Sequence, residues 1–376
     1  MDTISNDLFQ VMLGEDLPMF LQTFVFVPCI KNLASDEQLS VWLPLAESYA
    51  MVGCYAQTEL AHGSNVAGLE TTCTYIPETD EFELHTPNVG ATKWWVGQLG
   101  KLSNYAVVFA QLIIDNKNYG PHPFLTQIRS IKDHTPLKGI HVGDIGPKIG
   151  FNTVDNGFIR FDHFRFPRTG MLARFARVEK GGKYIKPPHS KLVYGSMLAV
   201  RVGIVTSVFR TTSAAVTIAV RYSAIRRQFS PKPGAPEKQV LDYMSQQYRV
   251  LPVLAQTFAV QFTGEWMSDI YVKLTHEMQV EGKFDLLPSV HAASAGLKSL
   301  TAFMLVKGVE NCRLACGGHG FSMFSGIPHL YTTWLQLVTA EGENLLMTQQ
   351  TARYLLKIYS QVVMGTAAFH PLDPGK

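Results

Sequence analysis

The hydrophobic periodicity of this 376-residue chain changes near residue 190, and this change limits the possible folds more than any other feature. Between residues 51 and 168, apolar and polar residues alternate at 81–85 and 158–166, and 106–114 is a continuous apolar run. Such short segments, separated by turn residues, indicate β-strands. Beyond residue 190 the helical period of 3.6 residues dominates. The sequence therefore predicts a β-domain followed by a helical bundle.

The predicted fold class is multidomain α and β, with N-terminal helices, a central antiparallel, barrel-like β-domain and a C-terminal helical bundle. Ser35 or Asp36 is the expected start of a helix that reaches about residue 50. The predicted parts are N-terminal helices at 1–50, a β-domain at 51–170, a linker at 171–190, a bundle at 191–365 and a tail at 366–376. Long helical stretches of the bundle are expected at 191–229, 238–279, 287–316 and 345–363.

The charge of the chain argues against a nucleic-acid partner. The formal net charge is +3, and no basic run exceeds Arg226-Arg227, whereas nucleic-acid binding needs a basic patch or stripe. Only 17% of the residues are charged, compared with roughly 25% in an average domain. We therefore expect another domain or subunit to cover part of the surface, and a polyanionic small molecule stays compatible with this charge.

Neither an export signal nor a transmembrane segment is predicted. The apolar stretch 19–30 is too short to span a bilayer, and acidic residues precede it where a signal peptide has basic ones. Five irregularly spaced cysteines fit a reducing compartment better than a disulfide framework. Cys312 and Cys316 share a helical face, but no second pair of ligands is nearby, so we interpret them as core residues and predict no metal site.

Two segments of the β-region offer surfaces for a polar or planar ligand. The turn at 55–65 contains Thr58 and Ser64, whose short side chains and neighbouring glycine suit contact with a polar ring or a phosphate. The segment 93–101 places Trp95 beside Gly97, so that a flat apolar face lies next to bare backbone. Each segment alone has an ordinary structural explanation, as a polar turn and as a tryptophan pair that fills the end of the β-domain.

Two segments of the helical region contain residues that could bind phosphate. Arg226 and Phe229 end a helical stretch, where a guanidinium group can bind phosphate bidentately. Cations at a helix C-terminus are also favoured by the helix dipole alone. Gly317 and Gly318 follow another helix, where they either cap it or admit a ligand close to the backbone.

Glu341 is the candidate catalytic residue. It precedes Gly342, which leaves room for a substrate, and it stands just before the last helix, for which Asn344 is the expected N-cap. A carboxylate on such a loop serves as a general base where a dry pocket raises its pKa, although most glutamates near helix starts have no such role.

In combination and in this order, the segments resemble those of acyl-CoA oxidases, flavoproteins related to acyl-CoA dehydrogenases. The resemblance extends from about residue 40 to residue 360. The matching stretches are YAQTELAHGSNVAGLETT at 55–72, KWWVGQLGKLSN at 93–104, GIHVGDIGPKIG at 139–150, VRYSAIRRQF at 220–229, ACGGHGFS at 315–322 and EGENLLMTQQTARYLLK at 341–357.

The resemblance implies an activity and a set of partners. The family oxidises a fatty acyl-CoA to the trans-2-enoyl-CoA, using FAD and passing electrons to O2 to form hydrogen peroxide. Glu341 would then remove the α-proton of the thioester, and a homodimer would be expected. The family also implies a peroxisomal location, although the chain ends in Pro374-Gly375-Lys376 and not in a peroxisomal tripeptide. A cytosolic location is the alternative.

The resemblance also implies roles for individual residues. Thr58 matches the threonine that hydrogen-bonds the flavin ring, Trp95 and Gly97 match residues that pack on or face it, and Ser64 matches a contact to cofactor or substrate. Arg226 and Phe229 resemble residues that reach the FAD of a neighbouring subunit. Gly317 and Gly318 lie in the segment that approaches the FAD pyrophosphate of that subunit.

Departures from the family pattern leave two other functions open. Ala61 replaces a glycine and Ala340 replaces an aromatic residue beside Glu341, and residues 1–50 resemble only the remnant of an N-terminal helical domain, with the last helical domain missing. One alternative is a non-catalytic member that acts through interactions. The other is an acyl-CoA dehydrogenase that passes electrons to a carrier flavoprotein.

Overall fold

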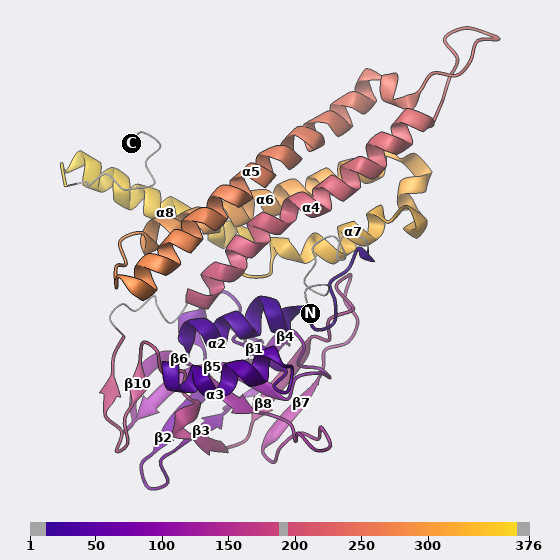
Figure 1. The fold of residues 1–376 in the computed structure, drawn as a ribbon. Helices are drawn as coiled ribbons and strands as arrows, with labels where there is room; N and C mark the ends of the chain where they lie inside the picture. Colours follow the sequence, from indigo (N-terminus) through magenta and orange to yellow (C-terminus); the bar gives the residue numbers. More distant parts are fainter. Residues whose placement is uncertain (1–12, 188–194, 367–376) are drawn as a thin grey trace. The chain divides into compact units, whose positions relative to one another are not determined.

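The computed structural model describes residues 13–187 and 195–366, which form two compact units (Figure 1). The β-unit contains residues 16–148 and 152–187. The helical unit contains residues 198–366, with short pieces at 13–15 and 149–151. The mixed α and β fold class, with a helical C-terminal region, is confirmed. Most of the predicted tail and residues 191–194 of the predicted bundle lie outside the described residues.

The N-terminal helices belong to the β-unit. They are the π-helix η1 (Gln22–Phe26), α2 (Val27–Leu33) and α3 (Asp36–Glu47). Ser35 and Gln38 form a capping box in which each side chain accepts a hydrogen bond from the other residue's backbone. The predicted helix start at Ser35 or Asp36 is therefore confirmed.

The strands of the β-unit form three sheets. The six-stranded sheet contains β1 (Gly53–Ala56), β2 (Thr72–Ile76), β3 (Glu81–His85), β5 (Tyr105–Ile114), β6 (Lys117–Gln127) and β9 (Phe164–Pro167). The three-stranded sheet contains β4 (Lys93–Val96), β7 (Ile140–Asp144) and β8 (Gly157–Phe161). Short 3-10 helices connect them at η2 (Val66–Gly68), η3 (Val89–Ala91) and η4 (Arg168–Gly170).

The pairing of the strands is mixed, which corrects the prediction of a wholly antiparallel β-domain. β5 pairs antiparallel with β6 along one edge. Along its other edge it pairs parallel with β1 over its first half and with β2 over its second half. A ten-residue strand has room for two shorter neighbours, and the long segments between them let the chain return in the same direction. Alternation in the sequence predicts a strand but not the direction of its neighbour.

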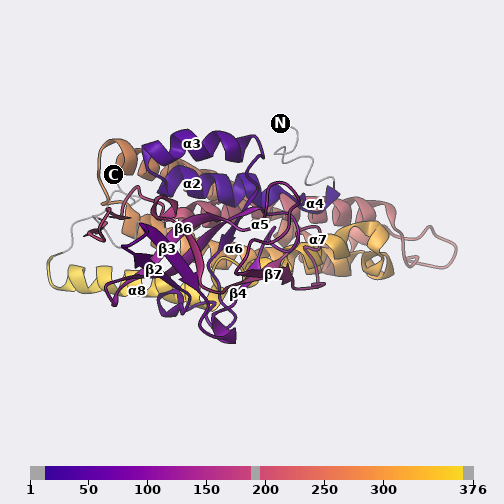
Figure 2. The ribbon, with the colours of Figure 1, turned by 90° about the horizontal axis from the view of Figure 1, so that it is seen from below.

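β5 is apolar throughout because both of its faces are buried. Ala106 and Val108 face a core shared with the three-stranded sheet. Val107 and Phe109, on the opposite face, pack with apolar residues of α2. Figures 1 and 2 show α2 and α3 on one side of these strands. This two-sided burial explains why the run at 106–114 does not alternate.

Two predicted segments differ from the structure. The alternating stretch 158–166 forms β8 and β9, separated at His163, whose φ of 46° ends the extended conformation. Residues 177–185 of the predicted linker instead form a hairpin of β10 (Arg177–Val178) and β11 (Tyr184–Ile185). Val178 is buried in the β-unit core, so apolar packing fixes a segment whose composition suggested a linker.

The helical unit is built from α4 (Gly195–Ile225), α5 (Met244–Val280), α6 (Leu287–Ala315), α7 (Ile327–Trp334) and α8 (Asn344–Val363). All four long helices were predicted at nearly these positions. Shorter turns of helix are η6 (Val240–Asp242), η7 (Gly317–Phe321), η8 (Met323–Ser325) and η9 (Leu335–Val338). α6 packs against α5 and α8, and thereby forms the centre of the unit.

Among the described helices, α4 alone has the length and apolar composition that would allow it to cross a membrane, over Leu198–Ile225. Half of its most apolar window is buried inside the structure. The core helix of a helical bundle has the same character, so this composition is weak evidence for a membrane segment.

Candidate active site

In the β-unit, the structure brings the polar turn and the tryptophan segment together. The Trp94 amide donates to the Thr58 carbonyl at 2.9 Å, and the Leu60 amide donates to the Thr92 carbonyl at 2.9 Å. Thr58 is half-buried and Ser64 is exposed. Three of the four candidate residues of this unit, Thr58, Trp95 and Gly97, therefore lie on or beside β4.

A buried ion pair that the sequence analysis missed ties these two segments together. Lys93 Nζ lies 3.0 Å from Glu59 Oε1, and both side chains are fully buried. Lys93 also donates to the Gln57 carbonyl at 3.0 Å, one residue before Thr58. The pair joins residues 34 positions apart in the chain, and no spacing within either segment marks it.

Glu59 is held by more than Lys93. Its carboxylate accepts hydrogen bonds from the Glu70 amide at 2.8 Å, the Thr71 amide at 2.9 Å and the Thr71 hydroxyl at 2.7 Å. Burial alone would raise the pKa of Glu59, but the Lys93 charge and these donors lower it. Burial lowers the pKa of Lys93 to about 8, against the opposing effect of Glu59. The network anchors the turn that carries Thr58.

Trp95 presents an apolar surface on β4. Its side chain is 57% exposed, and its φ is 68°. Asn156 Nδ2 donates to the Trp95 carbonyl at 2.7 Å and supports this conformation. The neighbouring Trp94 stacks on Phe158 instead, with ring centroids 5.4 Å apart. Of the predicted tryptophan pair, one ring therefore packs within the unit and the other is open to a ligand.

The surroundings of two small residues, Gly97 and Ala61, show what a side chain at each position would meet. A Cβ atom at Gly97 would lie 2.1 Å from Leu21 Cδ1, so a side chain there would displace the end of the Leu21 side chain, whether or not a ligand faces Gly97. Ala61 is exposed, and its φ is not positive. The alanine at this position therefore imposes no backbone strain on the turn.

In the helical unit, Glu341 occupies a constrained turn between η9 and α8. Its φ is 56°, in the left-handed region that costs a residue with a side chain about 1 kcal/mol or more. Gly342 has a φ of 103°, and a Cβ there would lie 2.6 Å from Met347 Cε. The glycine after the candidate base is therefore required by the turn itself.

Glu343, and not the predicted Asn344, caps α8. The Glu343 carboxylate accepts hydrogen bonds from the Leu345 and Leu346 amides at 2.9 and 3.2 Å. Asn344 is fully buried and is the first residue of the helix. Its side chain is used by α6, because Lys298 Nζ donates to Asn344 Oδ1 at 2.9 Å.

Two cations lie close to Glu341, and the sequence analysis named neither. Arg201 Nε, from α4, donates to the Glu341 carbonyl at 3.2 Å. Lys298, from α6, lies near enough to influence the carboxylate through its charge. Burial raises the pKa of Glu341, while Arg201 and Lys298 lower it. A carboxyl group with a raised pKa on a turn is suited to accept a proton from carbon.

The remaining candidates of the helical unit gather where α4 and α6 end. The rings of Tyr222 and His319 lie 5.8 Å apart, and Gln246 donates to both Ser223 Oγ and the Ala315 carbonyl. Arg226 and Phe229 are exposed on one segment. Gly317, with a φ of 57°, follows Cys316, the C-cap of α6, and a Cβ at Gly317 or Gly318 would meet no atom within 4 Å. The backbone here is open to a ligand.

Glu341 and this open end are far apart. Glu341 bonds to Arg201 near the start of α4, whereas Arg226 follows the last residue of the same helix. At 1.5 Å per residue, the backbones of Arg201 and Arg226 are roughly 37 Å apart. The Glu341 turn and Arg226 of one chain thus lie near opposite ends of α4.

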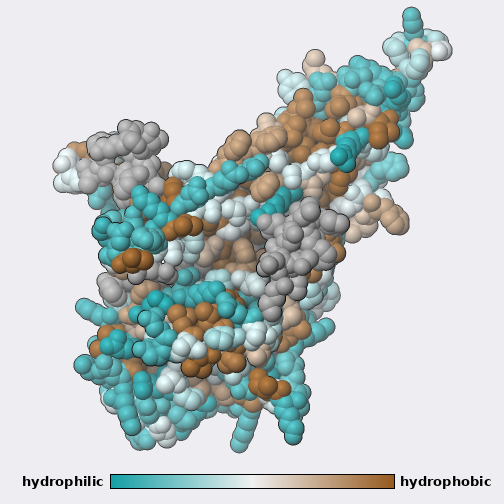
Figure 3. All heavy atoms as spheres, viewed as in Figure 1, coloured by the Kyte–Doolittle hydropathy of each residue, from teal (hydrophilic) through white to brown (hydrophobic). Residues whose placement is uncertain are grey.

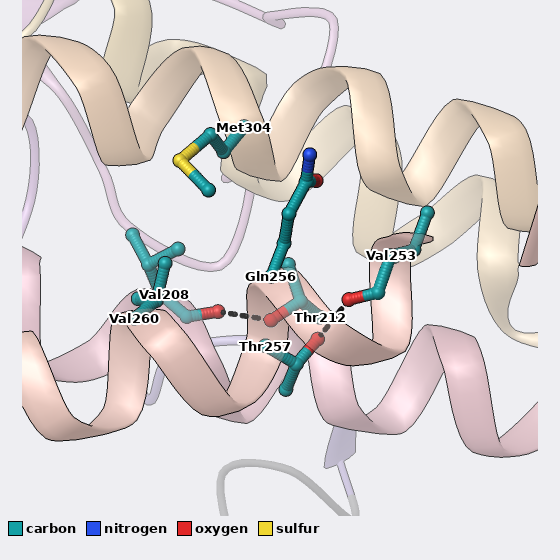
Figure 4. A pocket seen from close by; sticks show the side chains of 7 residues that line it. All are labelled: Val208, Thr212, Val253, Gln256, Thr257, Val260 and Met304. Atoms are coloured by element: carbon teal, nitrogen blue, oxygen red, sulfur yellow. Dashed lines mark hydrogen bonds between the residues drawn. The ribbon is translucent and has the colours of Figure 1, made fainter. Parts of the chain in front are cut away.

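Two other side-chain groups carry no assignment. The threonines Thr212 and Thr257 line a narrow gap between α4, α5 and α6, but their hydroxyls donate to carbonyls of their own helices (Figure 4). In the β-unit, His85, Asp162 and His163 form one group of possible metal ligands among the described residues. The two imidazole rings stack with their centroids 4.0 Å apart, and His163 Nδ1 lies 2.9 Å from a carboxylate oxygen of Glu83, so one of the possible ligands already has a partner.

Comparison with known proteins identifies the family. A model of the acyl-CoA oxidase C-alpha1 domain matches residues 194–356, and a model of the acyl-coenzyme A oxidase N-terminal domain matches residues 2–52. A peroxisomal acyl-coenzyme A oxidase 1 from Dictyostelium discoideum is 48% identical over 367 residues. The chain belongs to the acyl-CoA oxidase family. The match covers 96% of this chain and 52% of that relative, so the chain spans about half the length of the curated relatives it matches.

Solved acyl-CoA oxidases have the same fold. Acyl-CoA oxidase 1 of Arabidopsis thaliana has a TM-score of 0.91 and is 47% identical, with 95% of this chain and 55% of that chain covered. Acyl-CoA oxidase-2 of Caenorhabditis elegans has a TM-score of 0.92 and is 45% identical, with 94% and 54% covered. The latter was crystallised with FAD, ascaroside-CoA and ATP. Because these matches cover nearly the whole of this chain, they include both its β-unit and its helical unit.

Proposed function

We propose that this chain carries the chemistry of an acyl-CoA oxidase, the FAD-dependent oxidation of a fatty acyl-CoA to the trans-2-enoyl-CoA with reduction of O2 to hydrogen peroxide. The geometry of Glu341 is the observation that carries the proposal. The Glu341 side chain is partly buried, desolvation raises its pKa, and a glycine and two cations lie next to it. The family membership and the FAD-bound relatives support it.

The residues of the β-unit fit a flavin ring. The exposed Trp95 supplies an apolar face, and Thr58 lies on the adjacent segment with a half-buried side chain. We assign Thr58 to a hydrogen bond with the ring, and the Trp95 and Gly97 segment to its face. Ser64, exposed on the same turn, would contact cofactor or substrate. The Glu59–Lys93 network would keep Thr58 in place.

Glu341 would act as the base. Its carboxylate takes the α-proton of the thioester, so that the C–H bonding pair stays on the substrate and moves toward the β-carbon. FAD, which the Thr58 and Trp95 segments would hold, would supply the acceptor for the β-hydrogen as hydride and the route of the electrons to O2, which would yield hydrogen peroxide. The turn holds Glu341 in one place, which lowers the entropic cost of aligning the two C–H cleavages.

In a homodimer, both ends of the helical unit would have a role in FAD binding or catalysis. The open end with Arg226, Phe229, Gly317 and Gly318 is too far from Glu341 to hold the pyrophosphate of the same FAD. These residues would therefore reach the FAD of a second copy. Apolar side chains exposed along α5 support a partner surface, as Figure 3 shows; they include Tyr248, Leu251, Phe258, Phe262 and Trp266.

We also propose a peroxisomal location, which the names of the relatives support. Fractionation of cells that express the tagged chain tests it. Recovery with peroxisomal marker enzymes is expected, and recovery in the cytosolic fraction alone would contradict it.

The visible absorption spectrum of the purified chain, followed by anaerobic addition of an acyl-CoA, tests the main proposal. We expect bound flavin that bleaches on addition and peroxide once air is admitted. Glu341→Gln should keep the flavin and lose the bleaching by a factor of roughly 10² to 10⁴. Colourless protein that takes up no FAD would refute the proposal.

The same experiment separates the two alternatives. Bleaching without peroxide in air would indicate an acyl-CoA dehydrogenase. Flavin that does not bleach, in the parent chain and in Glu341→Gln alike, would indicate a non-catalytic member of the family.

A further inference from the structure

Lys298 lies in the middle of α6 and is fully buried, although it is not part of any ion pair of the kind that Lys93 forms. Its ammonium group donates to the Gly342 carbonyl at 2.6 Å and to Asn344 Oδ1 at 2.9 Å. Both acceptors are neutral, and both follow Glu341 within three residues. A buried ammonium group is costly unless it is bonded, so this placement indicates a function of the charge.

The contacts of Lys298 belong to a wider attachment between α6 and the turn. Ser299 Oγ donates to the Asn344 carbonyl at 2.9 Å, and Asn344 Nδ2 donates to the Ser299 carbonyl at 3.2 Å. Arg201 adds its hydrogen bond to the Glu341 carbonyl from α4. The left-handed conformation of Glu341 is thus held from two helices, and every one of these bonds is to the backbone of the turn or to Asn344.

Both hydrogen bonds of the Lys298 ammonium group go to Gly342 and Asn344, and neither goes to the carboxylate of Glu341. The charged groups that face Lys298 are Glu341, Arg201 and Glu343. Burial lowers the pKa of Lys298 to about 8, with Glu341 opposing this. At neutral pH the ammonium group is therefore charged, and it acts on Glu341 across space and not through a bond. A base that is attracted but not capped keeps its oxygen free for the substrate proton.

We propose that Lys298 is a positioning residue for Glu341, which fixes the turn through two neutral oxygens and supplies a positive charge that keeps the carboxylate ionised. The proposal rests on the function proposed for Glu341. One side chain would thus both orient the turn that carries Glu341 and keep the Glu341 carboxylate ionised at neutral pH. Without the charge, burial would leave Glu341 protonated over a wider range of pH and thus unable to accept a proton.

The test compares the pH dependence of anaerobic flavin reduction in the parent chain and in Lys298→Met, which removes the charge and both hydrogen bonds. The acid limb of the rate profile should move to higher pH by about one unit or more. Above pH 8, where Lys298 of the parent loses its proton, the effect of the charge should shrink. Lys298→Gln, which keeps a donor, should show the same shift if Lys298→Met fails to fold.

Two further variants separate the charge from simple attachment. Ser299→Ala removes one bond between α6 and the turn but keeps the ammonium group, so it should slow reduction without moving the acid limb. Lys307→Met, at an exposed position of the same helix, should leave the profile unchanged. An unchanged acid limb in Lys298→Met and Lys298→Gln would overturn the proposal.

An infrared titration of the protein without acyl-CoA provides a readout that does not depend on turnover. The protonated carboxyl band that disappears in Glu341→Gln should titrate at higher pH in Lys298→Met than in the parent. If the parent chain neither binds FAD nor bleaches, the proposed function fails while this titration still tests Lys298. If the parent bleaches and the band does not move, the inference on Lys298 fails alone.

Discussion

Lys93 in the β-unit and Lys298 in the helical unit are both fully buried, and burial lowers the pKa of each to about 8. Their glutamate partners differ. Glu59 accepts a direct bond from Lys93 and three more from Glu70 and Thr71, and its pKa is lowered. Glu341 is only near Lys298, and its pKa is raised.

The comparison shows how one pair of residue types serves two purposes. Where every lone pair of the carboxylate has a donor, the charge is stable but cannot take a proton, so Glu59 stabilises the turn at Thr58. Where the lysine bonds to backbone and amide oxygens instead, the carboxylate stays available. What distinguishes the structural Glu59 from the proposed base Glu341 is therefore which atoms the lysine bonds to, and not the presence of a lysine nearby.

The largest stability effect is expected for Glu59→Gln. It leaves Lys93 buried without a countercharge and replaces an acceptor of several bonds, so the free energy of unfolding should fall by about 3–5 kcal/mol. Denaturant unfolding measures this, with the exposed Glu78→Gln as the matched control. A loss below about 1 kcal/mol would mean that Glu59 is not the anchor of the turn.

A smaller loss is expected for Lys93→Met. Glu59 then keeps its bonds from Glu70 and Thr71, which still hold the carboxylate, so we expect a loss of about 2 kcal/mol. The same unfolding measurement tests the order of the two variants. If Lys93→Met proves more damaging than Glu59→Gln, the lysine and not the glutamate organises the network.

Glu341→Gln should change stability in the opposite sense, by a modest amount that depends on pH. Because the pKa of Glu341 is raised in the folded chain, its burial cost is absent below about pH 4.5 and appears as the pH rises through the folded pKa. The variant lacks this cost. Its melting temperature should therefore be higher than that of the parent at neutral pH and equal to it at acid pH. Thermal melting at several pH values checks the sign, and a lower melting temperature at pH 7 would contradict a desolvated base.

The smallest effect is expected for Ala61→Gly, in the turn that Glu59 anchors. Ala61 is exposed and unstrained, so the added freedom of glycine should cost at most about 1 kcal/mol and leave FAD retention nearly unchanged. Flavin content after gel filtration measures this. A large gain in FAD binding would show that the alanine methyl group obstructs the cofactor.

Local patterns predicted much of this molecule. Alternation located β3, the helical period located α4, α5, α6 and α8, and the expected helix start at Ser35 or Asp36 located α3. These signals succeed because strand and helix place residues a few positions apart on one face. One alternating stretch was predicted where a turn at His163 separates β8 from β9. A linker was predicted where apolar packing of Val178 fixes the β10–β11 hairpin.

The candidate site divides in the same way. Thr58, Trp95, Gly97 and Glu341 were named from their own segments, and the structure places each on a turn or strand where such a role is possible. Their cofactor and substrate contacts stay predictions. The partners that set their chemistry were not named, because Glu59 and Lys93, or Lys298 and Gly342, look unremarkable in their own segments.

Residue order was thus sufficient for the family, for most of the helices and strands and for the identity of the candidate base. Folding determined the parallel neighbours of β5, the capping of α8 by Glu343 and the surroundings of Glu341. The physical reason is distance along the chain. Lys298 and Gly342 are 44 residues apart, and a pKa depends on which charges and donors meet in space after packing has removed the water.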